Sequence, residues 1–76
     1  MTIYQFTMLD EMEQIEAIWD AVEVGEYQDE VYLYKCYQID AFYVETKKHK
    51  EHDVLHGIRT FKNPALLDLF LGFGNQ

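Results

Sequence analysis

A chain of 76 residues, 49% of them hydrophobic, is long enough for one folded domain and too short for a large core. The net charge of −8 argues against binding to nucleic-acid phosphates. The single cysteine excludes an internal disulfide and a zinc site built from several thiolates. We therefore expect residues 1–76 to form a single compact domain.

The acidic residues are concentrated in the first part of the chain. Residues 1–30 carry nine Asp and Glu and no Lys or Arg, whereas residues 31–76 carry five acidic and six basic residues. Such a distribution is typical of a solvated face that keeps a small protein soluble, or of a docking surface for a basic partner. A third interpretation is an acidic mimic of nucleic acid that blocks a basic protein.

Apolar residues at helical spacing predict an amphipathic helix over roughly residues 8–20. Thr7 is its predicted N-cap, with Asp10 three residues later in a weak capping-box position. A stripe of methionine and aromatic side chains on a helix normally faces the core, so we expect the stripe to be buried. Its members are Met8, Met12, Ile15 and Trp19.

After this helix the hydrophobic period changes to two, which predicts an antiparallel meander of three or four strands. The segments with this pattern are residues 21–25, 30–39, 41–47 and 52–61. Asp40-Ala41 is the expected hairpin turn, and Gly57 is the expected position of a bulge. The side chains predicted to face the core are Val31, Leu33, Tyr37, Ile39, Phe42 and Val44, and those on the opposite face are Tyr32, Tyr34, Cys36, Tyr43 and Glu45.

A short helix is predicted at the end of the chain. Asn63 is its N-cap, Pro64 its first residue and Gly72 its left-handed C-terminal position, which leaves two turns at residues 65–71. The expected fold class is therefore α+β, with an N-terminal amphipathic helix, an antiparallel three- to four-stranded meander and a short C-terminal helix.

Three histidines within eight positions, His49, His52 and His56, raise the question of a metal site. The strand-like sequence on both sides predicts a hairpin tip, which would scatter the three rings, and three nearby lysines would repel a cation. The pattern therefore favours a polar hairpin tip that can respond to pH, without metal ligands.

Few residues suggest catalysis. The chain contains no serine and no glycine-rich phosphate loop, and Cys36 lies in the middle of a predicted strand, where a packed, unreactive thiol is expected. We predict no catalytic residue, no cofactor and no metal. The start of the chain has no basic and apolar regions of a signal peptide, and no apolar stretch is long enough for a membrane span, so a cytoplasmic protein without membrane contact is expected.

Two surfaces carry more apolar side chains than a monomer of this size is expected to bury. They are the tyrosine-rich face of the sheet and the terminal helix, which is apolar almost all round. The predicted interface residues are Tyr32, Tyr34, Tyr43, Leu67 and Leu71. The preferred hypothesis is a small non-enzymatic protein-interaction or regulatory module that forms a homo-oligomer, such as a dimer, or binds another protein. The alternative is small-molecule binding or a weak enzymatic role in a tyrosine-lined pocket, with Cys36 or His56 as the reactive group.

Overall fold

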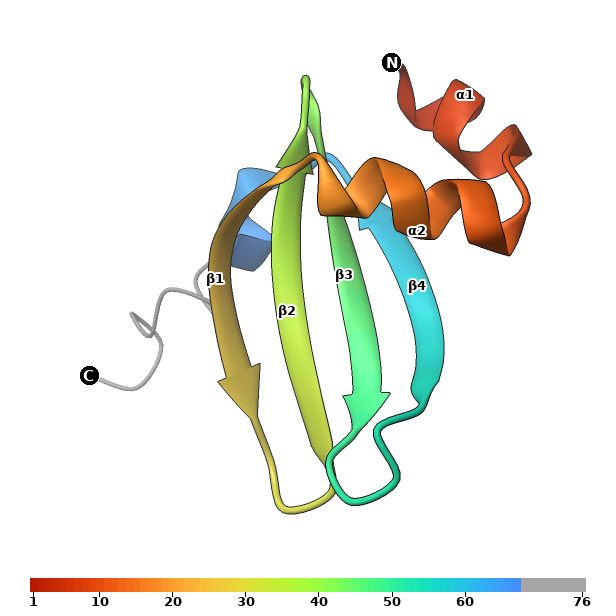
Figure 1. Ribbon diagram of the computed structural model, residues 1–76. Coiled ribbons are helices and arrows are strands. Elements are labelled where there is room, and N and C mark those ends of the chain that lie inside the picture. The colour runs from red at the N-terminus through yellow and green to blue at the C-terminus, as the bar shows by residue number, and fades with distance from the viewer. Residues whose placement is uncertain (68–76) are drawn as a thin grey trace.

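The computed structural model describes residues 1–67 of the chain, with side chains up to residue 65. The fold is α+β and consists of two short helices followed by a four-stranded antiparallel sheet (Figure 1). The elements in chain order are α1 (Ile3–Met8), α2 (Glu11–Trp19), β1 (Val22–Gln28), β2 (Tyr32–Ile39), β3 (Phe42–His49), β4 (Leu55–Phe61) and the 3₁₀-helix η1 (Pro64–Leu67). The predicted class and the antiparallel meander are confirmed.

Each α-helix begins at a capping box. In this motif the N-cap side chain accepts a hydrogen bond from the backbone N–H three residues later, and the side chain of that later residue accepts one from the N-cap N–H. At α1, the Gln5 N–H donates to Thr2 Oγ1 at 3.2 Å and the Thr2 N–H donates to Gln5 Oε1 at 2.8 Å. At α2, Asp10 and Glu13 make the same pair of bonds at 2.8 and 3.3 Å. The prediction that Thr7 caps a helix is wrong, because Thr7 lies inside α1 and its hydroxyl donates to the carbonyl three residues earlier.

The predicted single helix over residues 8–20 is interrupted at Leu9, and its expected core stripe is largely exposed. Leu9 and Asp10 have extended backbone, so a spacing counted across them does not describe one helix face. The exposed fractions are 86% for Met8, 70% for Met12 and 77% for Trp19. The helical residues that are buried are instead Phe6 of α1 and Ile18 of α2.

The strands lie in the order β1-β2-β3-β4. Asp40-Ala41 forms the predicted two-residue turn between β2 and β3, and Asp40 adopts a φ of 52°, a left-handed conformation that Asp tolerates better than most residues. On β4, Leu55 and Gly57 pair with consecutive residues of β3, so one extra residue is inserted between them. The bulge predicted at Gly57 is confirmed at this place.

Within β2 and β3 the side chains alternate between the two faces of the sheet as predicted. The prediction that Val31 faces the core is wrong, because Val31 precedes β2 and is 45% exposed. On the face that the helices cover, Phe42 and Val44 are buried together with Phe6 and Ile18, and the Phe6 and Phe42 rings lie 5.8 Å apart. The opposite face holds a second buried cluster, and η1 lies on this side of the sheet (Figure 1). Its members are Cys36 and Phe61, with Val24, Tyr27, Tyr34 and Tyr43 partly buried around them.

The helices cover only part of their face of the sheet. Figure 1 shows α2 crossing the strands near the end that carries the Asp40-Ala41 turn, and no helix of residues 1–67 lies over the other half of that face. The uncovered half is the part of the fold that positions the candidate site.

The described part of the C-terminal segment agrees only partly with its prediction. Asn63 Oδ1 accepts a hydrogen bond from the Ala65 N–H at 3.0 Å, as expected for a cap, and Pro64 opens the helical segment. That segment is a 3₁₀-helix up to Leu67. The rest of the predicted helix, with Leu71 and Gly72, lies outside the described residues. Within residues 1–67 no helix is long and apolar enough to cross a membrane.

Replacing Asp10 with alanine is expected to destabilise the protein by about 1 kcal/mol, because it removes the N-cap of α2. Thr7→Ala is the matched control and is expected to change the free energy of unfolding by less than about 0.5 kcal/mol. Urea unfolding followed by circular dichroism measures both values. A loss for Thr7→Ala as large as that for Asp10→Ala would contradict the division into two capped helices.

Candidate functional site

A groove lies on the helix side of the sheet, between α2 and the uncovered half of the strands. Its volume is about 320 Å³, at the lower end of the range for ligand pockets. We refer to it as the helix-side groove. The residues that line it are Ile15, Ile18 and Trp19 of α2, Leu33, Lys35 and Tyr37 of β2, Thr46 and Lys48 of β3, Asp53 of the β3–β4 turn, and Leu55 of β4.

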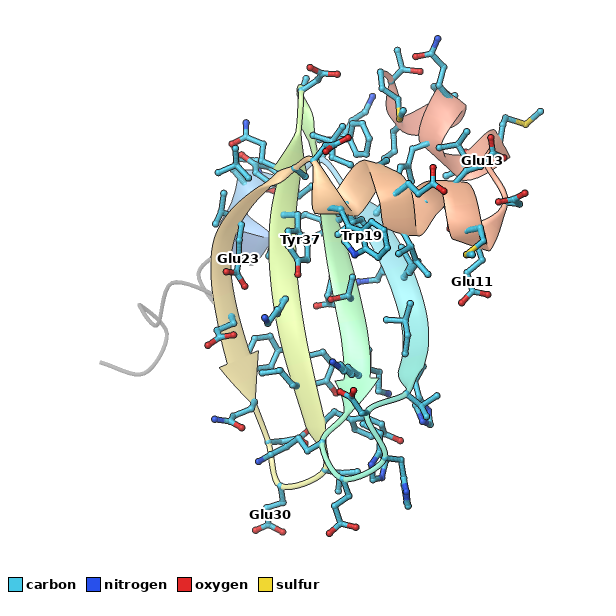
Figure 2. All side chains as sticks on the ribbon, viewed as in Figure 1. Glu11, Glu13, Trp19, Glu23, Glu30 and Tyr37 are labelled. Carbon is cyan, nitrogen blue, oxygen red and sulfur yellow. The ribbon has the colours of Figure 1, made fainter. Side chains whose placement is uncertain are left out.

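Trp19 and Tyr37 define the end of the groove next to α2. Trp19 is the last residue of α2, and its side chain lies beside Tyr37 on the near face of the sheet in Figure 2. The indole is largely exposed although it lies against the sheet surface. Burial raises the pKa of the Tyr37 hydroxyl, which is therefore protonated and available as a hydrogen-bond donor at neutral pH.

The two lysines of the groove are already paired with acidic residues. Lys35 Nζ lies 3.6 Å from Glu23 Oε1 on the neighbouring strand, and Lys48 pairs with Asp53 across the turn. Further acidic side chains are exposed on the elements that border the groove and have no basic partner among the ion pairs of residues 1–65. They are Glu11 and Glu16 of α2, Asp20 directly after α2, and Glu26 of β1, and the positions of Glu11 and Glu23 can be followed in Figure 2. The rim of the groove is therefore predominantly negative.

The exposed apolar surface continues from the groove onto the helices. Met12 lies on the same stripe of α2 as Ile15 and Trp19 and is 70% exposed. Single exposed apolar residues need no explanation, but large ones that gather along one helix face beside a groove mark a surface for interaction. The stripe that the sequence assigned to the core thus belongs to the surface.

The three histidines lie close together at the end of the sheet that carries the β3–β4 turn, and His49 and His56 pack against Tyr32 on the sheet face opposite the helices. His49 is the last residue of β3, and its ring centroid is 4.5 Å from that of His52 in the turn and 5.7 Å from that of His56 in β4. A polar hairpin tip is confirmed, but the expectation that it scatters the rings is wrong. The bulge in β4 turns His56 toward Tyr32, against which His49 also packs. Among residues 1–65 no group of three or more His, Cys, Asp or Glu side chains is placed to hold a metal ion.

The three predicted interface tyrosines all lie on the sheet face opposite the helices, where they are half-buried. Tyr34 stacks on Tyr27 with the ring centroids 4.6 Å apart, and Tyr43 stacks on Phe61 at 5.3 Å. The Tyr32 ring carries Lys47 Nζ at 4.1 Å from its centroid. These rings therefore shield one another to a large extent. The three tyrosines do not line the helix-side groove or the two cavities whose walls include Gln14 and Gln28.

Cys36 and His56, the two candidate reactive groups, do not lie in a catalytic arrangement. Cys36 is fully buried, and desolvation together with the carboxylate of Glu45 raises its pKa to about 11. Glu45 is itself buried and accepts a hydrogen bond from Arg59 at 3.1 Å across the β3–β4 pair. His56 packs against the rings of Tyr32 and His49. The thiol is thus held in its neutral, weakly nucleophilic form.

The remaining predicted interface residues are Leu67 and Leu71. Leu67 is the last residue of η1, and its side chain is not described, while Leu71 lies outside the described residues. Trp19, Leu33 and Leu55 were not predicted from the sequence as groove residues. For Trp19 the signal lay in the two capping boxes TIYQ and DEME, because they divide the predicted helix in two and make Trp19 the last residue of the second helix.

Comparison with known protein families, with curated proteins and with solved structures finds no match to this chain.

Cys36 is expected to resist thiol reagents in the folded protein. With a pKa of about 11, only about one thiol in a thousand is ionised at pH 8, and the side chain has no exposed surface. Labelling of the native protein and of the urea-unfolded protein can be compared by mass spectrometry. The native rate is expected to be at least about a hundredfold lower. Equal rates in the two states would contradict the burial of Cys36.

Proposed function

We propose that this protein is a non-enzymatic protein-interaction module that binds a basic segment of another protein in the helix-side groove. The observation that carries the proposal is a largely exposed tryptophan, Trp19, at the edge of an apolar groove with an acidic rim. The module is proposed to act in the cytoplasm, where its single free thiol needs no partner.

The apolar part of the groove is suited to one anchor side chain of the partner. Ile15, Leu33 and Leu55 form a partly buried floor, and Trp19 stands at its edge with most of its ring exposed. Tryptophan is enriched among the residues that carry most of the binding energy in protein interfaces. An aromatic or aliphatic side chain that enters the groove would cover this ring, and the Tyr37 hydroxyl could donate to the backbone of the bound segment.

Charge selects the class of partner. The first thirty residues, which form both helices and β1, carry nine acidic and no basic side chains, and the groove lysines are already paired. A segment rich in Lys and Arg would therefore be attracted and oriented at the rim. A second copy of the chain, docked here about a twofold axis, would set Glu11, Glu16 and Asp20 against the same residues. Repulsion between like charges makes that arrangement unfavourable.

Self-association through the tyrosine face and the terminal segment stays a separate prediction, carried by Tyr32, Tyr34, Tyr43, Leu67 and Leu71. The alternative of a small-molecule site lined by the tyrosines is less favoured, because the rings of Tyr34 and Tyr43 already stack on Tyr27 and Phe61. The helix-side groove offers the more open apolar surface.

A dye-labelled peptide rich in Lys and Arg with one central Phe is a suitable probe, measured by fluorescence anisotropy. We expect saturable one-to-one binding that weakens at least about tenfold when the Phe is replaced by Ala or when Trp19 is replaced by Ala. Raising the salt concentration from low to high ionic strength should weaken binding further, because the rim charges are screened.

Met8→Ala is the matched control, because Met8 is at least as exposed as Trp19 but does not line the groove. Its affinity for the peptide should equal that of the unchanged protein. A peptide with Glu in place of Lys and Arg should not bind. Equal loss in the Met8→Ala and Trp19→Ala variants would contradict the groove as the site. Light scattering on the free protein reveals whether a second copy occupies the groove, in which case Trp19→Ala would reduce the molar mass.

A further inference from the structure

The β3–β4 turn, residues 50–54, forms the end wall of the helix-side groove opposite α2. Asp53 belongs to the turn, Leu55 follows it directly and Lys48 precedes it, and all three line the groove. A second cavity, lined by Leu33, Lys48 and Asp53 among others, adjoins this wall. The conformation of the turn therefore determines the shape of the groove at this end.

Hydrogen bonds to His49 hold the turn in place. The backbone N–H groups of Glu51 and His52 both donate to His49 Nδ1, each at 3.2 Å. The main chain of His49 adds two more bonds, since its N–H donates to the Val54 carbonyl at 2.9 Å and its carbonyl accepts from the Asp53 N–H at 3.0 Å. Asp53 has a left-handed backbone, with φ of 55°. We call this hydrogen-bonded conformation the closed turn. Because His49 Nδ1 accepts both bonds, the closed turn requires this nitrogen to be unprotonated.

The charged and titratable groups around His49 come from β2, β3, β4 and the turns at this end of the sheet. Tyr32 of β2 contacts its ring edge-on, and His56 of β4 and His52 of the turn lie against it. Lys47 of β3 lies over Tyr32, while Lys50 donates to the Asp29 carbonyl in the β1–β2 turn. The Asp29 carboxylate interacts with both lysines, and Glu51 and Asp53 of the turn itself are exposed. Histidine is the type of side chain whose charge responds to pH near neutrality, so a change of pH acts first on this cluster of rings.

We propose that protonation of His49 opens the β3–β4 turn and weakens docking in the helix-side groove, so that binding of the basic partner depends on pH. Imidazolium carries a proton on Nδ1 and cannot accept the two N–H bonds of the turn. Positive charge on the three adjacent rings then adds to that of Lys47 and Lys50, and the rings repel one another. This regulation rests on the proposed function of the groove.

The free protein tests the turn without any partner. The amide signals of Glu51 and His52 and the ring signals of His49 can be followed by NMR from pH 7.5 to 5.5. Both amides are expected to shift with the same midpoint as His49. His49→Asn is expected to abolish their titration, because the Asn side-chain oxygen accepts hydrogen bonds at every pH in this range. His52→Gln is the matched control and should keep the titration, since the hydrogen bond that His52 donates to His49 comes from its backbone N–H. Amides that do not follow His49 would overturn the proposal.

The labelled basic peptide tests the consequence for docking. Its affinity is expected to fall roughly five- to tenfold from pH 7.5 to 5.5 in the unchanged protein and in His52→Gln, and by less than about twofold in His49→Asn. Equal affinity at both pH values in the unchanged protein would overturn the regulation and leave the groove as a binding site. Absence of binding at either pH would overturn the proposed function, while the amide titration would still decide whether His49 controls the turn.

Discussion

The contact of Phe6 with Phe42 holds the two helices at one end of the sheet, and the open groove is its consequence. With Ile18 and Val44, these rings form the buried cluster on the helix side. A nine-residue helix is about 14 Å long and about 10 Å wide, enough to cross four strands but not to cover strands of eight residues, which run about 26 Å. Because the hydrophobic contact fixes the helices near the Asp40-Ala41 turn, half of the face stays uncovered.

The same limit explains why Trp19 is exposed. α2 ends at Trp19 because the chain turns there into β1, and the residues that fill the space beneath the helix are Ile18 and the two phenylalanines. Burying the indole would require additional residues over the strands, which the described chain does not place there. A partner that supplies an apolar side chain would complete this part of the core, and the acidic surroundings would favour a basic one.

The strands, their turns and their two faces could be predicted from the sequence because each depends on local patterns. The period-two alternation, the two-residue Asp40-Ala41 turn and the bulge at Gly57 are properties of neighbouring residues. The prediction of one helix over residues 8–20 was wrong because the apolar spacing was counted through Leu9, where the backbone is extended. The groove and the histidine cluster could not be predicted in the same way. Both depend on tertiary placement, namely where α2 lies on the sheet and how the bulge turns His56 toward Tyr32.

Quenching of the single tryptophan in the free protein shows directly whether the groove is open and its surroundings acidic. We expect acrylamide to quench Trp19 almost as efficiently as it quenches a tryptophan amide in water, at low and high protein concentration alike. We also expect caesium, relative to the same reference compound, to quench Trp19 better than iodide does, because exposed acidic residues lie on the elements that border the groove. A strongly shielded Trp19 at every concentration, or preferential quenching by iodide, would contradict an open groove with an acidic rim.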